Sequence, residues 1–295
     1  MPIAVRARAT AVVGAALLLS LATVSAATAS VHTAAAPTGK YVSLGDSYVA
    51  GPLIPDQSGG LCLRSDHDYP SLTAAAIGSS ALVDASCSGA TTVDMTQSQS
   101  DAGITINAPQ LNAVTGDARL VTLGIGGNDI GFVDIILTCA GLSLTNPFGD
   151  PCTAHYTGGG ADQLAALINA TEPKVAAVLQ AIRQRAPQAR VLVVGYPDIL
   201  PEHNNGCWPL QPIAYGDVSY LRATEKRLNS MLATAAAQIG AQYVDTYTPT
   251  IGHDICQAAS VKWIEGVVPL APAAPMHPNA KGEAAMARAV ESALG

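Results

Sequence analysis

Four short segments of this chain hold the residue types that acyl transfer requires. The first, Gly45-Asp46-Ser47-Tyr48, directly follows an apolar run at 41–44 that predicts a strand. Gly45 permits a tight turn there, so Ser47 is expected at the carboxyl edge of a sheet, where open α/β proteins bind ligands. The other three segments are 87–92, which contains Gly89, 126–129, which contains Asn128, and 277–279, which begins with His277. A serine nucleophile, two oxyanion donors and a histidine base together indicate covalent acyl transfer.

The serine requires a base, because its hydroxyl is a weak nucleophile at neutral pH. Histidine suits this role, since its ordinary pKa lies close to working pH. The chain has six histidines. Only His277 stands in a His-Pro-Asn segment at the expected start of a helix, so we predict that His277 is the base.

The order of the four segments resembles the SGNH hydrolase family, also called GDSL lipases and esterases, across residues 40–295. The resemblance implies that Ser47 is the nucleophile and His277 the general base. It places the backbone N–H groups of Ser47 and Gly89 and the side-chain amide of Asn128 in the oxyanion hole. It also implies a three-layer α/β/α sandwich around a flavodoxin-like, five-stranded parallel sheet of strand order 2-1-3-4-5. The tyrosine of GDSY replaces the family's leucine, and the resemblance gives it no chemical role.

One position departs from the usual family pattern. Most members have an aspartate three residues before the histidine, whereas this chain has Ala274. Some actinobacterial relatives use a backbone carbonyl instead, so we predict that the carbonyl oxygen of Ala274 accepts from Nδ1–H of His277. The alternative is a carboxylate supplied from elsewhere, with Asp254 as the first candidate.

Alternating strand and helix patterns surround these segments and predict an α/β fold with a parallel sheet. We expect long loops at 52–68 and 138–160 to border the substrate cleft. Strands are predicted at 41–44, 81–85, 120–123, 191–194 and 242–244, and helices at 71–77, 161–185 (split or kinked by Pro173), 219–239 and from Pro278 through Ala289.

The N-terminal residues have the three-part pattern of a secretory signal. Arg6 and Arg8 precede an apolar stretch at 11–22, and small residues follow at 24–29. We therefore predict a signal peptide at 1–29, a single SGNH hydrolase domain at 30–295 and a secreted, extracellular enzyme. An N-terminal anchor is the alternative. We expect no stable membrane insertion, because no other run approaches the ~20 apolar residues that a span requires.

The six cysteines behind this leader indicate disulfides in an extracellular protein. Spacing alone does not choose among the 15 possible pairings. The resemblance to secreted actinobacterial lipases and esterases favours sequential pairing, as Cys62–Cys87, Cys139–Cys152 and Cys207–Cys256. Zinc binding is the competing interpretation, but the chain lacks a Cys-x-x-Cys pair.

Charge and composition narrow the possible partners. Loss of the leader removes two arginines and takes the formal charge from −7 to −9, which disfavours nucleic acid and anionic membranes. We predict a monomeric carboxylic ester hydrolase, a lipase or esterase, that acts on a lipid or small-molecule ester without metal or cofactor. The alternatives are an acyltransferase, a phospholipase or acetylesterase on the same fold, and a catalytically silent surface-binding protein.

Overall fold

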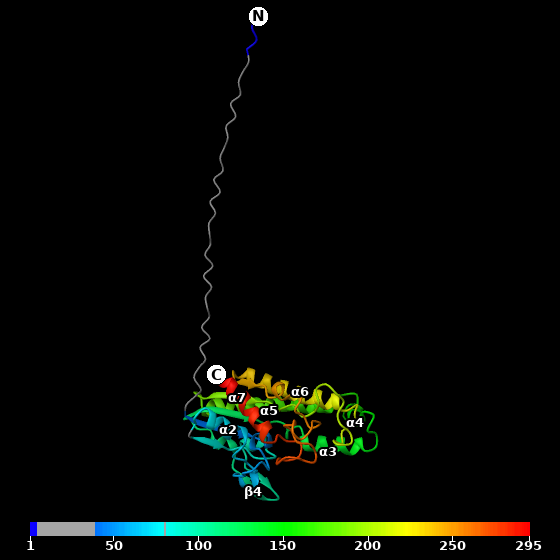
Figure 1. The fold of residues 1–295 in the computed structure, drawn as a ribbon. Coiled ribbons are helices and arrows are strands. Elements are labelled where there is room, and N and C mark those ends of the chain that lie inside the picture. The colour runs from blue at the N-terminus through cyan, green and yellow to red at the C-terminus, as the bar shows by residue number, and fades with distance from the viewer. Residues whose placement is uncertain (5–38, 80) are drawn as a thin grey trace. The chain divides into compact units, whose positions relative to one another are not determined.

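The computed structural model describes residues 1–4, 39–79 and 81–295 (Figure 1). Met1–Thr33 and Ala34–Gly295 form separate units, and all the elements below belong to the second unit. The predicted signal peptide at 1–29 lies outside the described residues, apart from its first four. The boundary between leader and domain therefore stays a prediction.

A five-stranded parallel sheet forms the centre of the second unit (Figure 1). Its strands lie in the order β2-β1-β5-β6-β7, and every neighbouring pair is parallel. Counted along the chain, this is the order 2-1-3-4-5 that the resemblance implied, and each predicted strand overlaps one of the five. The strands are β1 (Lys40–Gly45), β2 (Leu82–Asp84), β5 (Ala118–Gly124), β6 (Arg190–Val194) and β7 (Gln242–Val244).

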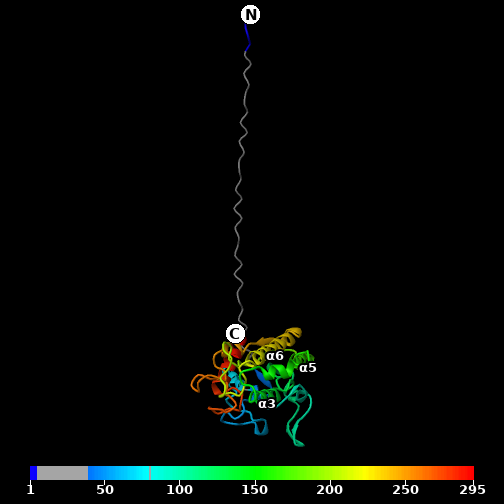
Figure 2. The same ribbon diagram turned by 90° about the vertical axis from the view of Figure 1, so that its right-hand side faces the viewer.

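Helices cover both faces of this sheet and complete the predicted three-layer sandwich (Figures 1 and 2). Successive strand residues point to opposite faces, so neighbours on β5 enter different cores. Val121 packs in the core that contains Leu179 and Leu232, whereas Leu120 packs in the core that contains Met286. The first core contains residues of α5 (Gln163–Arg185) and α6 (Val218–Gln238), and the second contains residues of α2 (Tyr69–Ala76) and α7 (Ala280–Leu294).

The region 138–160 is more regular than the loop that we predicted. It contains the end of α3 (Phe132–Ser143) and all of α4 (Pro151–Thr157). The carboxylate of Asp217, the residue before α6, accepts from the N–H groups of Cys152 and Thr153 at 3.0 and 2.8 Å. Asp150 and Pro151 stand at the N-cap and the first position of α4, but the Asp150 side chain makes no capping bond, and the distant Asp217 accepts from the free N–H groups instead.

Helix α5 is continuous through Pro173, so the split that we predicted as one alternative does not occur. Proline removes one backbone hydrogen bond from a helix interior. Ile168 before it and Val175 and Leu179 after it are all buried in the same core. Packing on both sides of the proline therefore holds the helix together despite the lost bond.

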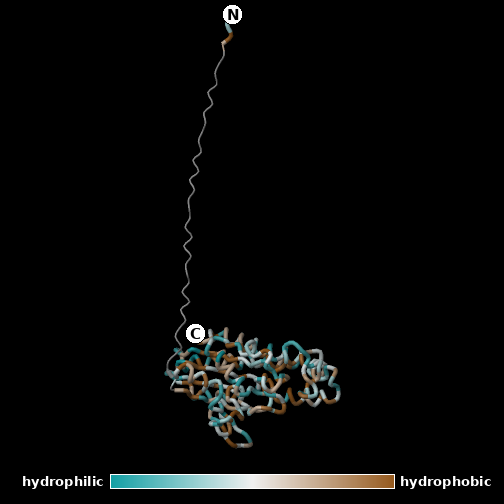
Figure 3. Tube along the Cα trace, in the orientation of Figure 1, coloured by the Kyte–Doolittle hydropathy of each residue, from teal (hydrophilic) through white to brown (hydrophobic). Residues whose placement is uncertain are grey.

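A small antiparallel hairpin was absent from the predicted elements. Strands β3 (Gln99–Asp101) and β4 (Ile104–Asn107) meet at a two-residue turn, in which Ala102 and Gly103 both have positive φ. The hairpin lies away from the sheet (Figure 1). In the coloured part of the trace, hydrophilic and hydrophobic stretches are interspersed (Figure 3). Its strands are short and largely exposed, so they lack the apolar run that identifies a buried strand.

The six cysteines form three disulfides in the sequential pairing that the resemblance favoured. They are Cys62–Cys87, Cys139–Cys152 and Cys207–Cys256. No helix in the described part of the chain combines the length and apolar content needed to cross a bilayer. Within the same described residues, no three His, Cys, Asp or Glu side chains gather where they could hold a metal ion.

Candidate active site

Ser47 is the first residue of α1 (Ser47–Ala50), directly beyond the carboxyl end of β1. The turn depends on Gly45, because a Cβ there would lie 2.3 Å from the carbonyl oxygen of Gly124. The backbone N–H and carbonyl of Gly45 pair with the side chain of Gln110 at 2.8 and 2.9 Å. These contacts fix the serine at the sheet edge where the sequence predicted it.

His277 lies against Ser47, although 230 positions separate them in the chain. Its Nε2 is 2.7 Å from Oγ of Ser47, and its Nδ1 is 2.7 Å from the carbonyl oxygen of Pro275. A carbonyl can only accept, so Nδ1 carries the proton and Nε2 of the neutral ring is left to accept from the serine hydroxyl. Burial lowers the pKa of His277, and the bond to Pro275 opposes that effect. The ring is therefore held in the tautomer and charge state of a base.

The structure corrects the prediction for Ala274 by one residue. The carbonyl of Ala274 accepts from the backbone N–H of His277 at 3.2 Å, whereas the ring bonds to Pro275. Met276 lies between Pro275 and His277 and has φ +64°. This left-handed conformation turns the chain and aims the Pro275 carbonyl at the ring. The alternative residue was Asp254. Its carboxylate accepts from Cys256 N–H at 2.8 Å and from the Gln257 side-chain amide at 2.9 Å, so it stabilises the local turn at 254–257.

Tyr48 also contacts the histidine, a role that the sequence did not indicate. Its hydroxyl donates to the carbonyl of Met276 at 2.6 Å. Its ring centroid lies 4.7 Å from that of His277, with 30° between the planes. The residue after the nucleophile therefore supports both the strained backbone before His277 and the face of the imidazole.

The proposed oxyanion donors come from three segments that meet at the sheet edge. No group in the described residues accepts from the backbone N–H of Ser47 or of Gly89, and Gly89 has φ +80°. The amide of Asn128 donates to the carbonyl of Ala90 at 2.9 Å, which fixes its orientation and leaves its second N–H free to donate. Unused donors of this kind can stabilise a developing negative charge.

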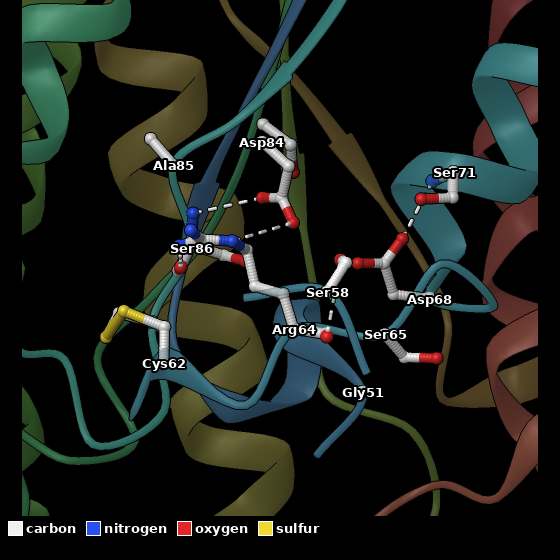
Figure 4. A network of polar contacts seen from close by, with 12 residues as sticks. Gly51, Ser58, Cys62, Arg64, Ser65, Asp68, Ser71, Asp84, Ala85 and Ser86 are labelled. Carbon is white, nitrogen blue, oxygen red and sulfur yellow. Dashed lines mark hydrogen bonds and ion pairs between the residues drawn. A yellow bond between two sulfur atoms is a disulfide. The ribbon is translucent and has the colours of Figure 1, made fainter. Parts of the chain in front are cut away.

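A polar network holds the segment that leads to Gly89 (Figure 4). Arg64 donates from Nη1 to the carbonyl of Ser86 at 2.6 Å, and its Nε lies 3.9 Å from the carboxylate of Asp84. The same carboxylate accepts from Ser86 N–H at 3.0 Å. With the neighbouring disulfide at Cys87, these contacts fix the backbone just before Gly89.

Asp46 is buried beneath the nucleophile and orders the turn. Its carboxylate accepts from Tyr48 N–H at 2.9 Å and from the Tyr196 hydroxyl at 2.6 Å. Tyr196 in turn accepts from Gly127 N–H at 2.8 Å, which links the serine turn to the Asn128 segment. Burial raises the pKa of Asp46 to about 7, and the bond from Tyr196 opposes the rise.

An apolar pocket opens beside Ser47 and His277. Its walls come mainly from α3, from the segment after β6 and from α6. They include Ile135, Ile136, Ile199, Leu200, Leu221 and Leu228. Glu225 also lines the pocket, and burial raises its pKa well above the ordinary value, which favours the neutral acid. The pocket thus offers a largely uncharged surface next to the nucleophile.

Comparison with known proteins identifies the family of the chain. Residues 43–285 match the GDSL-like Lipase/Acylhydrolase family. The chain belongs to this family. It is 40% identical to Lipase 2 of Streptomyces coelicolor over 292 residues, which covers 97% of this chain and 96% of that protein. It is 33% identical to a lipase of Streptomyces rimosus over 247 residues, or 82% of each chain.

Solved structures show the same fold. The crystal structure of phospholipase A1 from Streptomyces albidoflavus NA297 matches with a TM-score of 0.70 and 29% identity, over 88% of this chain and 99% of that one. The extracellular lipase of Streptomyces rimosus also matches with a TM-score of 0.70 and 29% identity, over 86% and 99%. The chain is therefore a lipase or esterase, a carboxylic ester hydrolase of the GDSL family.

Proposed function

We propose that this protein is a secreted lipase or esterase that acts through an acyl-enzyme on Ser47. The observation that carries the proposal is the contact of 2.7 Å between Ser47 Oγ and His277 Nε2, with Nδ1 held by the carbonyl of Pro275. This is a nucleophile and a base with a third group that orients the base. The orienting group is a neutral carbonyl, which stabilises the imidazolium less than a carboxylate would.

The reaction begins when Ser47 Oγ bonds to the ester carbonyl carbon and its proton passes to His277 Nε2. The N–H groups of Ser47 and Gly89 and the Asn128 amide bind the oxyanion. When the tetrahedral intermediate collapses, the bond to the alcohol oxygen breaks and that oxygen takes the proton from Nε2. Water then attacks the acyl-enzyme, again with His277 as base, which releases the acid and restores the serine.

The apolar pocket supports esters with an aliphatic acyl chain as substrates. The walls around Leu200, Leu221 and Leu228 would bury a hydrocarbon chain, at about 0.8 kcal/mol for each buried methylene. A phospholipid is a second candidate, because a structurally similar protein is a phospholipase A1. Transfer of the acyl group to an alcohol instead of water would use the same intermediate, and assays with added glycerol would detect it.

The test is hydrolysis of p-nitrophenyl esters from C2 to C16 by the wild type, Ser47→Ala and His277→Ala. The matched control is His253→Ala, since His253 also bonds a backbone carbonyl through Nδ1 but has no contact with the serine. We expect both site variants to lose at least about 10³-fold in kcat and the control to keep wild-type turnover. Full activity in Ser47→Ala, or activity that EDTA abolishes, would refute the proposal.

Secretion and oligomeric state need separate measurements. The predicted leader, three disulfides and the extracellular S. rimosus relative support export. We expect the exported protein to begin shortly after residue 26 or 29, which N-terminal sequencing would show. We also expect a monomer, which would elute from size exclusion near the mass of one chain.

A further inference from the structure

Helix α3 exposes apolar side chains that the core does not use. Ile135 and Cys139 face the interior, whereas Val133, Leu137 and Leu144 are 55%, 65% and 70% exposed. Leu144 keeps helical backbone angles just beyond the last residue of α3. With 3.6 residues per turn, positions 133, 137 and 144 fall on one side of the helix. We call these three residues the α3 stripe.

The stripe is continuous with the pocket at the active site. Val133 is exposed and also lines that pocket, while Ile135 and Ile136 of the same helix form part of its wall. α3 thus separates the pocket from solvent, with apolar side chains on both sides. Figure 2 views the molecule from the side that carries this helix. Phe148, just beyond the stripe, is 80% exposed and stacks on Tyr215, which extends the apolar surface.

The charge of this region defines the partner. Residues 132–149 contain one charged side chain, Asp134, and no lysine or arginine. The whole chain has a formal charge of −7. Such a surface gains nothing from anionic headgroups, which attract basic segments, but it can bury apolar area against an uncharged surface. A ridge of aliphatic side chains at the mouth of an acyl pocket fits a layer of neutral or zwitterionic lipid.

We propose that the α3 stripe docks the enzyme on the surface of aggregated, uncharged lipid. Val133 and Leu137 enter the apolar boundary of the lipid and bring the pocket mouth against the acyl chains. The inference rests on the proposed ester hydrolysis, but it assigns a separate surface. Loss of docking should therefore impair hydrolysis of aggregated lipid while hydrolysis of dissolved esters continues.

The test compares Leu137→Asp with Ile104→Asp. Leu137 does not line the pocket, and Ile104, on the β4 hairpin, is similarly exposed at 61%. Sedimentation with phosphatidylcholine vesicles measures the binding of each variant to lipid. Hydrolysis of p-nitrophenyl butyrate, at a concentration where this ester is fully dissolved, measures its catalytic activity. We expect Leu137→Asp to bind the vesicles at least about tenfold more weakly and to hydrolyse emulsified long-chain triacylglycerol correspondingly more slowly. Its butyrate turnover should stay within about twofold of the wild type, and Ile104→Asp should match the wild type throughout.

Several outcomes would overturn the inference. The stripe would not be the docking surface if the wild type fails to sediment with the vesicles. The same conclusion would follow if Leu137→Asp and Ile104→Asp bind the vesicles equally well. Salt-sensitive preference for phosphatidylglycerol vesicles would contradict an uncharged partner. If Leu137→Asp does not fold, Leu137→Gln makes the same comparison with a strong helix former. Absence of turnover by the wild type on every p-nitrophenyl ester from C2 to C16 would refute the proposed function instead, while vesicle binding would still report on the stripe.

Discussion

Tyr48→Phe tests how the backbone before His277 is held. The substitution removes one hydroxyl, whose donation to the buried Met276 carbonyl spans 2.6 Å. The ring remains, with edge contacts to Phe132 and Tyr196 at centroid distances of 6.0 and 5.1 Å, so no large cavity forms. The substitution therefore leaves a buried carbonyl without its donor, which should lower the free energy of unfolding by about 1–3 kcal/mol.

The same substitution should affect catalysis more than binding. Met276 has a strained, positive φ, and the Tyr48 hydroxyl helps to hold it and so to aim the Pro275 carbonyl at His277. Looser positioning of a catalytic base by about 1 Å can cost about 10²-fold in rate. We expect kcat on p-nitrophenyl butyrate to fall by about 10- to 100-fold, with KM within about threefold.

Tyr41→Phe is the matched control. Tyr41 is also buried, and its hydroxyl lies 2.9 Å from that of Thr122, but it packs in the other core and does not contact His277. Urea unfolding should show a loss of about 1 kcal/mol for Tyr41→Phe, with kcat unchanged. Equal kcat in wild type and Tyr48→Phe, or equal losses in both variants, would refute a positioning role for Tyr48.

Three further predictions concern the site and its support. Asn128→Ala should lower kcat by about 10²–10³-fold with a circular dichroism spectrum like that of the wild type, and a loss below about threefold would exclude the amide from the oxyanion hole. Because burial lowers the pKa of His277, kcat/KM should rise with pH through a midpoint below the ordinary value of 6.5 and then stay level; a midpoint above 6.5 would contradict the buried, uncharged base. Burial and the neighbouring Asp84 raise the pKa of Asp68, so the folded state holds a proton that the unfolded state releases, and stability falls as pH rises above about 4. Asp68→Asn keeps an acceptor for Ser71 N–H but cannot ionise. In urea titrations at pH 8, the loss of unfolding free energy relative to pH 4 should be smaller in this variant than in the wild type by about 1 kcal/mol or more. An unchanged pH dependence of stability would show that Asp68 does not cause the loss.

The sequence allowed prediction of those features that local residues determine. The five strands are apolar runs, and Ser47, Gly89 and Asn128 each follow a predicted strand, so parallel pairing brings their segments to one edge. His277 was identifiable because His-Pro-Asn precedes a helix, in which Asn279 caps α7. The β3–β4 hairpin was missed because its strands are short, exposed and without an apolar run. The other features that were missed depend on contacts between distant residues or on one backbone angle.

Three residues illustrate this limit. The orienting carbonyl belongs to Pro275 and not to Ala274 because Met276 adopts a positive φ, which its side chain does not signal. The start of α4 is satisfied by Asp217, 65 positions from Cys152. Tyr48 supports the histidine loop only because β1 and the end of the chain meet in space.

The central claim is that Ser47 becomes acylated with His277 as its base. The most direct measurement is intact-protein and peptide mass spectrometry after reaction with a p-nitrophenyl alkylphosphonate. Ser47 Oγ should displace p-nitrophenolate from phosphorus, and the stable adduct would resemble the tetrahedral intermediate. We predict one phosphonyl group on the peptide that contains Ser47, slow formation in His277→Ala and none in Ser47→Ala. An adduct on another residue, or equally fast labelling of Ser47→Ala, would contradict the account.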